Sequence, residues 1–218
     1  MGIRKLLAPE MPDGPISSVP LTLRSASTMY YPECLPPILD FLDRIEMPFK
    51  AGPFGQDGFL PGIQIVNGVM LIDPDRLTGS GDVLHEAGHI VIVPSRWRSA
   101  LGNDVLETLD EVVAADPDAR DDFKLQTSIK MSEFMAQAWS YAAVKDLDLP
   151  PECVFFPGSY KIHSDVKPHP MAAWVESGTH FGIMALSQVG MTGGVGIFEP
   201  MGANGLPPFP KMAKWLQD

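Results

Sequence analysis

Two histidines interrupt the most apolar helix that the sequence predicts. His85, Glu86 and His89 form the pattern H-E-x-x-H inside a stretch that is otherwise apolar from Val83 to Val93. Residues four apart lie on one face of a helix, so both imidazoles can bind one metal ion while the glutamate reaches a water on that ion. The pattern therefore predicts a zinc site in which Glu86 is the general base.

The segment before this helix predicts a β-hairpin. Asn67 and Gly68 separate two β-branched and apolar runs, at 63–66 and 69–72, and this pair readily adopts the positive φ angles of a tight turn. We expect the histidine helix to end at Pro94. The candidates for its N-cap are Thr78, Ser80 and Asp82.

Apolar periodicity predicts further helices at 36–46 and at about 129–146, and another around 171–189. Residues 103–122 carry eight acidic side chains and predict a broken, exposed helical or loop segment. The proline-rich first 35 residues and the Gly/Pro-rich stretch 190–210 predict little regular structure.

Composition narrows the class of protein. The 218 residues include 45% hydrophobic residues, enough for one domain with a metal-site core at about 62–150, an N-terminal wrap at 1–35 and a loop-rich extension at 151–218. The net charge of −11, without runs of Lys or Arg, argues against nucleic acid as a partner. No stretch approaches the roughly 20 apolar residues of a membrane span. With two cysteines and no signal-like start, we expect a cytoplasmic protein.

A catalytic zinc usually has three protein ligands, so a third is expected. Ile92 and Ser95 stand where the metzincin pattern requires Gly and His, which excludes that class. Glu133, in the predicted helix at 129–146, is the main candidate, and the small Ala136 one turn later would let the two helices approach closely. The alternatives are Glu107, Asp110 and Glu111.

From about Gly62 to Pro150, the hairpin, the H-E-x-x-H helix and the second, glutamate-bearing helix resemble zincin metallopeptidases of the gluzincin type, and more loosely the ImmA/IrrE-like metallopeptidases. The resemblance implies an α+β, zincin-like fold: a small antiparallel sheet packed on the H-E-x-x-H helix and a second glutamate-bearing helix. It also implies His85, His89 and Glu133 as ligands of Zn²⁺. The chain differs from the thermolysin-like pattern at Ser132, Ala136 and Gln137.

These features predict a zinc-dependent hydrolase, most simply a metallopeptidase acting on a peptide or protein substrate. Besides Glu86, we expect a catalytic donor to the oxyanion, for which His180 is the first candidate. Tyr160, Tyr141 and His163 are the others. A zinc enzyme acting on a small amide, or a metal-binding regulatory module with little turnover, is the alternative. The acidic segment at 103–122 would border the cleft and favour neutral or basic substrates.

Overall fold

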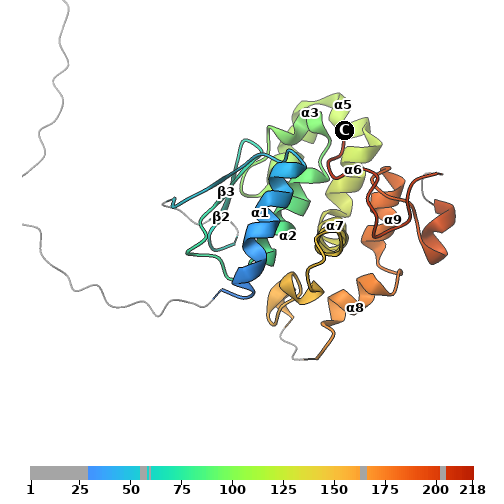
Figure 1. Cartoon of the computed structure of the whole chain (residues 1–218). Coiled ribbons are helices and arrows are strands. Elements are labelled where there is room, and N and C mark those ends of the chain that lie inside the picture. Colours follow the sequence, from blue (N-terminus) through green and yellow to red (C-terminus); the bar gives the residue numbers. More distant parts are fainter. Residues whose placement is uncertain (1–28, 55–57, 59, 163–165, 202–204) are drawn as a thin grey trace, which may run out of the picture.

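The structure is a computed structural model that describes residues 29–54, 58, 60–162, 166–201 and 205–218. It is α+β, with helices grouped beside one small sheet (Figure 1). The three described strands are β1 (Phe49–Ala51), β2 (Ile63–Val66) and β3 (Val69–Ile72), in the order β1-β3-β2. β2 and β3 are antiparallel, whereas β1 is parallel to β3. The prediction of an antiparallel sheet is therefore wrong for β1, whose three residues are too few to show a period.

The predicted hairpin is confirmed, and its turn residues have the expected backbone. Asn67 has φ 52° and Gly68 has φ 73°. A Cβ on Gly68 would lie 2.3 Å from the carbonyl oxygen of Arg98, so the loop after the histidine helix leaves room only for glycine at this position. The Gly68 amide donates a hydrogen bond to the carbonyl of Leu101. The hairpin is thus fastened to the chain that follows the histidine helix.

The α-helices are α1 (Leu35–Arg44), α2 (Gly81–Val91), α3 (Ser95–Arg98), α4 (Val105–Ala115), α5 (Pro117–Asp121), α6 (Phe123–Lys130), α7 (Ser132–Asp146), α8 (Pro170–Glu176) and α9 (Phe181–Gln188). The 3-10 helices are η1 (Pro32–Cys34), η2 (Pro151–Cys153), η3 (Ser159–Lys161) and η4 (Gly196–Met201). None of the helices in the described ranges is long and apolar enough to cross a bilayer.

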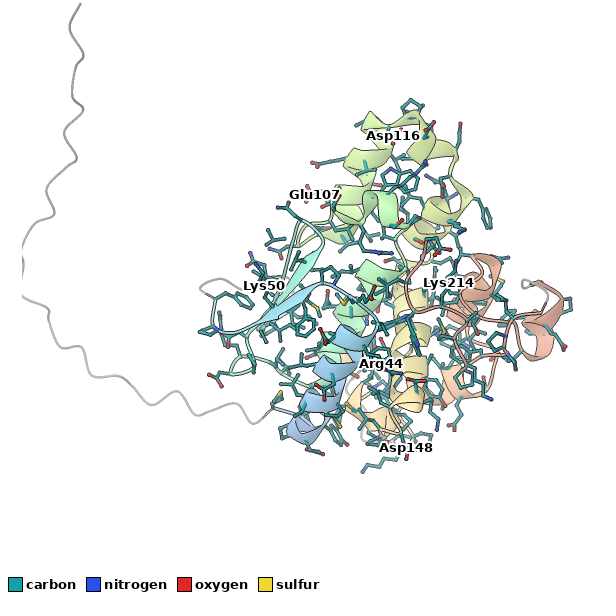
Figure 2. The ribbon with its side chains drawn as sticks, turned by 45° about the horizontal axis from the view of Figure 1, so that its top comes forward. Arg44, Lys50, Glu107, Asp116, Asp148 and Lys214 are labelled. Atoms are coloured by element: carbon teal, nitrogen blue, oxygen red, sulfur yellow. The ribbon has the colours of Figure 1, made fainter. Side chains whose placement is uncertain are left out.

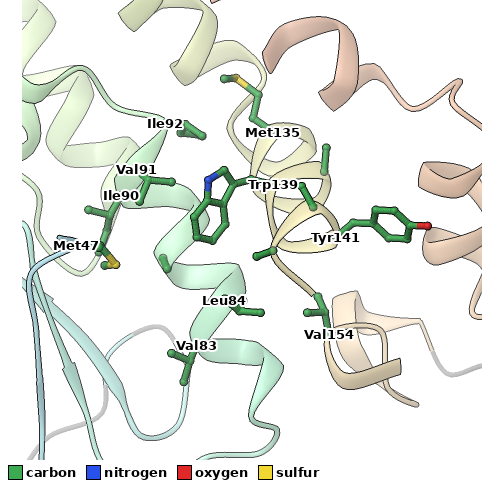
Figure 3. Close-up of a cluster of buried hydrophobic side chains, with 14 of the residues drawn as sticks. Met47, Val83, Leu84, Ile90, Val91, Ile92, Met135, Trp139, Tyr141 and Val154 are labelled. Carbon is green, nitrogen blue, oxygen red and sulfur yellow. The ribbon is translucent and has the colours of Figure 1, made fainter. Parts of the chain in front are cut away.

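The centre of the fold is the pair α2 and α7, which run side by side with the sheet on one flank and α8 and α9 on the other (Figure 1). The two backbones approach closely because Gly88 faces Ala136: a Cβ on Gly88 would lie 2.9 Å from the Cα of Ala136. The Ser140 hydroxyl on α7 donates to the Leu84 carbonyl of α2. The fully buried Trp139 lies among the apolar side chains of both helices (Figure 3).

Both ends of α2 are tied to distant parts of the chain. Ser80 is the N-cap residue, but its hydroxyl donates to the carbonyl of Tyr31 rather than capping the helix. At the other end, the Val91 carbonyl accepts from the Gln217 amide and the Ile92 carbonyl from the Ser128 hydroxyl. The two contacts at the C-terminal end satisfy carbonyl groups that the end of a helix leaves unpaired. Together with the contact of Ser80, they fix the helix that carries the histidines.

The acidic segment is helical, mostly exposed and interrupted, as expected from its sequence. Residues 103–122 contain the whole of α4 and α5, and Asp116 between the two helices is extended. Asp104, Asp116 and Asp122 are the N-caps of α4, α5 and α6, and each carboxylate accepts a backbone N–H of the first turn. Part of the acidic excess therefore starts helices.

Two predicted helices are each divided in the structure. The helix expected at 129–146 is split between α6 and α7, because Met131 leaves the helical conformation at φ −117° and ψ 15°. The segment around 171–189 forms α8 and α9, which are separated by Gly178 with φ 73°. The described part of the N-terminal wrap forms η1 and a bridge from Tyr30 to Gly79. The prediction for residues 1–28 lies outside the described residues.

Candidate metal centre

Three side chains from α2 and α7 converge on one point. The Nε2 atoms of His85 and His89 are 3.2 Å apart. The Oε2 atom of Glu133 lies 3.8 Å from Nε2 of His85 and 3.5 Å from Nε2 of His89. Glu133 comes from the first turn of α7, and the close contact between Gly88 and Ala136 brings that turn to the histidines. Among the described residues, this is the cluster of His, Cys, Asp and Glu side chains that could hold a metal ion.

The spacing of these atoms suits a small tetrahedral ion. Ligand atoms bound about 2.0–2.1 Å from a tetrahedral zinc lie about 3.3 Å from one another. The three separations of 3.2, 3.5 and 3.8 Å are close to that value. Two imidazole nitrogens and one carboxylate oxygen also form a donor set of the catalytic zinc type, which leaves a fourth position for water or substrate.

The protonation states of the cluster also suit a metal. Burial and, to a smaller extent, His89 lower the pKa of His85 to about 3, against an opposing effect of Glu133. Burial alone would raise the pKa of Glu133, but its hydrogen bond to His89 and the two imidazoles together lower that pKa to about 2. His85 is therefore neutral and Glu133 ionised at neutral pH. Metal ligands must be deprotonated, and these two already are.

Two of the three candidate ligands are held by neighbouring polar groups. Nδ1 of His89 lies 2.9 Å from the Ser132 hydroxyl, so the other ring nitrogen is turned toward the cluster. Nε2 of Gln137 donates to Oε1 of Glu133 at 2.9 Å, leaving Oε2 directed at the histidines. Such contacts orient metal ligands and tune their basicity. Ser132 and Gln137, where the chain departs from the thermolysin-like pattern, thus have a local explanation.

His180 lies behind the cluster, at the end of a chain of hydrogen bonds. Its Nε2 is 3.1 Å from Oε1 of Gln137, and its Nδ1 accepts from the Gly182 amide as the N-cap of α9. The side chain is fully buried, and burial lowers its pKa to about 4. Both ring nitrogens thus have protein partners, and the structure connects His180 to Glu133 through Gln137 rather than to open space.

Glu86 is buried yet has no polar partner in the described parts of the chain. Its side chain is 5% exposed and makes no hydrogen bond or ion pair with the described residues. Burial raises its pKa, with a further rise from Glu133 and an opposing effect of His89. Burying a carboxylate without a polar partner is unfavourable in free energy. We therefore expect Glu86 to pair with a water molecule or a substrate group.

Two cavities flank the metal cluster, and Glu86 and Glu133 line both. The larger, of about 380 Å³, we call the acidic cavity; its other lining residues are Leu60, Thr78, Asp82, His85, Val154, Phe156, Gly158, Ser159 and Tyr160. The smaller, of about 200 Å³, we call the α4 cavity; it is completed by His89, Asn103, Asp104, Val105 and Leu106. The three residues of the cluster therefore line these two cavities: His85 the acidic cavity, His89 the α4 cavity, and Glu133 both.

Of the candidate oxyanion donors, Tyr160 lines a cavity. Its ring meets that of His85 edge to face with centroids 4.9 Å apart, and stacks on Phe155. Its hydroxyl oxygen is buried and makes no hydrogen bond of good geometry among the described residues; burial raises the pKa of this hydroxyl, and a contact with the Ser140 side chain opposes the rise. Tyr141 instead packs on Phe155 and Phe209 and lines neither cavity. His163 lies outside the described residues.

The alternative third ligands lie apart from the histidines. Glu107, Asp110 and Glu111 are exposed on α4, and none belongs to the metal-type cluster of the described residues. Figure 2 labels Glu107 at the surface of the molecule. Of the acidic segment, it is Asp104 that borders a cavity.

The chain was compared with protein-family models, curated proteins and solved structures. No protein-family model, no curated protein and no solved structure matches the chain. The function of the protein is therefore inferred from the geometry of the cluster and of the residues around it.

Sequence reasoning missed two features of the site. It considered Asp82 only as a cap, although a position three before His85 lies on the same helical face. It treated Ser132 and Gln137 as departures from a pattern rather than as partners of His89 and Glu133. The spacing of four between Glu133 and Gln137 could have indicated the second of these contacts.

Proposed function

We propose that this protein is a zinc-dependent hydrolase that cleaves peptide bonds. The observation that carries the proposal is the convergence of His85, His89 and Glu133 at separations of 3.2–3.8 Å beside the buried, unpartnered Glu86. A structural zinc site would be closed by a fourth protein ligand, whereas the described residues contribute three to this cluster.

In the proposed reaction, each residue has a separate task. His85, His89 and Glu133 would hold Zn²⁺, which when bound lowers the pKa of water and polarises the substrate carbonyl. Glu86 accepts the proton of the attacking water and delivers it to the leaving amine. Its raised pKa suits both steps, because a base that must return its proton works best with a pKa near the working pH.

Tyr160 is the donor that we assign to the oxyanion. Its ring lies against His85, and its buried hydroxyl makes no hydrogen bond of good geometry among the described residues, so a substrate oxygen that gains negative charge beside it would supply an acceptor. His180 takes a different role in this proposal. Through Gln137 it positions Glu133, which makes it a positioning residue rather than a catalytic one.

A peptide fits the acidic cavity and the α4 cavity better than a compact small amide does. One cavity is lined by His85 and the other by His89, and both are lined by Glu86 and Glu133. A substrate whose scissile carbonyl lies at the cluster can therefore extend into both. This arrangement favours a chain with residues on each side of the bond.

The test is the variant Glu86→Gln, assayed on a library of fluorogenic peptides. Gln keeps the size of the side chain but cannot accept the proton, so we expect turnover to fall at least a thousandfold while zinc content stays at one ion per chain. The matched control is Glu107→Gln, which removes a carboxylate from the exposed face of α4 and should leave turnover unchanged. Zinc binding without any turnover in the wild-type protein would favour a regulatory module instead.

A further inference from the structure

The acidic cavity contains a carboxylate that the proposed reaction does not use. Asp82 lines this cavity together with His85 and Glu86. It lies three residues before His85 and four before Glu86, so all three side chains share one face of α2. At 1.5 Å per residue, Asp82 is displaced about 4.5 Å along the helix axis from His85, a distance of one to two residues of extended peptide.

The carboxylate of Asp82 is fixed but its charge is not neutralised. Oδ2 accepts a hydrogen bond from the Gly79 amide at 3.0 Å, which holds the side chain in the first turn of α2. No ion pair of Asp82 is found within the described ranges. The charge of Glu86, which has the same sign, disfavours the ionised form of Asp82, whereas a bound cation would favour it.

The charges lining the cavity do not balance even with a metal ion in place. Asp82, Glu86 and Glu133 contribute three carboxylates, and no Lys or Arg is among the described residues of the lining. A dication at the cluster would offset two of these negative charges and leave one. Since Glu133 and Glu86 face the metal and its water, Asp82 is the carboxyl group left to face a cationic group of the substrate, and such a group would favour its ionised form against the burial that favours its protonation in the metal-free chain.

Aromatic groups complete the surroundings of Asp82. Phe156 and Tyr160 line the same cavity, and Phe156 is held in place by stacking on Tyr30 with ring centroids 4.9 Å apart. A carboxylate beside aromatic rings is the usual setting for an organic cation, because rings attract ammonium and guanidinium groups through their π faces.

We infer that Asp82 is a specificity residue that binds an ammonium or guanidinium group of the substrate, one or two residues from the scissile bond. The inference rests on the proposed function, since it assigns the substrate class of the same site. The cation has two possible sources, a Lys or Arg side chain or the free α-ammonium group of a peptide, and the two are chemically equivalent for Asp82.

The experiment is an NMR titration of the zinc-loaded full chain with three small probes. Nα-acetyl-lysine methylamide carries a side-chain cation, leucine methylamide carries an α-ammonium group, and Nα-acetyl-leucine methylamide is neutral. We expect at least one cationic probe to bind tenfold or more tightly than the neutral one. The probe that does so identifies the source of the cation.

The variant Asp82→Asn tests the residue itself. Asn retains an oxygen for the Gly79 amide, so the helix start is preserved while the charge is lost. We expect the cationic probes to bind within twofold of the neutral probe in this variant, with neutral binding unchanged. In the control Glu107→Gln, which changes the net charge equally but outside both cavities, the tenfold preference should persist.

Three results would overturn the inference: equal binding of cationic and neutral probes by the wild-type chain, an undiminished preference in Asp82→Asn, or a second zinc ion that is lost in Asp82→Asn. The zinc content of every sample is measured and the readout is binding rather than turnover. Failure of the proposed hydrolysis would therefore be seen separately, in the assay of Glu86→Gln.

Discussion

The floor of the candidate site and its walls are built in different ways. The floor consists of His85, His89 and Glu133, which come from two adjacent helices whose backbones touch at Gly88 and Ala136. The walls come from separate segments, at 78–82, 103–106 and 154–160. The two helices fix the distances between the metal ligands, while the walls combine loop residues with the first turns of α2 and α4.

The difference predicts that changes to the floor and to the walls have separable effects. Alterations of the floor should affect metal binding and stability together, because the same helix contact carries both. Alterations of the walls should affect turnover or substrate choice while zinc remains bound.

The largest effect is expected for Gly88→Val. Even a Cβ at this position would lie 2.9 Å from the Ala136 backbone, so the larger side chain must push α2 away from α7. We expect the free energy of unfolding to fall by about 3 kcal/mol and zinc affinity to fall with it. Chemical denaturation and zinc titration measure the two quantities. The control is Gly102→Ala, where a new Cβ would meet only the flexible Thr108 hydroxyl at 3.3 Å; equal losses in both variants would contradict the helix-contact explanation.

Tyr160→Phe should come next, and it should affect a wall alone. The variant keeps the ring packed on His85 and Phe155 but removes the buried hydroxyl. We expect kcat to fall about a hundredfold with zinc affinity unchanged, as for the loss of one oxyanion donor. Steady-state kinetics beside the control Tyr141→Phe would measure this. If the two variants were equally active, Tyr160 would not be the donor.

Gln137→Leu should weaken the floor more mildly. The change removes the donor that orients Glu133 and the acceptor that holds His180. Zinc affinity, measured by competition with a chelator, should fall about tenfold, the lower end of the range for partners of metal ligands. The exposed Gln188→Leu serves as the control. Undiminished affinity would show that Glu133 needs no support from Gln137.

The smallest expected effect concerns the stability of the metal-free protein. Burial, opposed by the Gly79 hydrogen bond and helped by Glu86, raises the pKa of Asp82 to about 7. The folded chain thus keeps a proton on Asp82 between about pH 4 and pH 7, where the unfolded chain loses it, so stability falls as the pH rises through this window. The variant Asp82→Asn should not lose stability in this way, because Asn does not titrate. Its advantage over the wild type in urea denaturation should be about 1 kcal/mol or more greater at pH 8 than at pH 5; an equal difference at both pH values would contradict the assignment.

The difference between the floor and the walls also explains how much of the fold and of the candidate site could be predicted from the sequence. The hairpin and α2 follow from local signals, the Asn67-Gly68 turn and the apolar period around His85. The contact between the helices could be anticipated from Ala136, because a small residue one turn after Glu133 marks a close approach. In each case the information lies within a few residues along the chain.

The walls could not be predicted, because their contacts join distant parts of the chain. Tyr160 reaches His85 through a turn in which Gly158 has φ 88° and Tyr160 itself has φ 53°, a backbone path that no periodic pattern encodes. The break at Met131 and the parallel pairing of β1 likewise depend on tertiary packing rather than on local propensity. His180 was expected to be a donor to the oxyanion, and its hydrogen-bonded link to Glu133 through Gln137 is a contact that required the fold.

The most direct measurement is zinc binding by the wild-type chain, Glu133→Ala and Glu107→Ala, using metal analysis together with thermal melting at increasing zinc concentration. The wild type and Glu107→Ala should bind one zinc ion per chain and melt at a higher temperature with zinc than with magnesium. Glu133→Ala should lose at least a hundredfold in affinity and most of that shift. Absence of stoichiometric zinc from the wild type, or full affinity in Glu133→Ala, would contradict a metal centre formed by His85, His89 and Glu133.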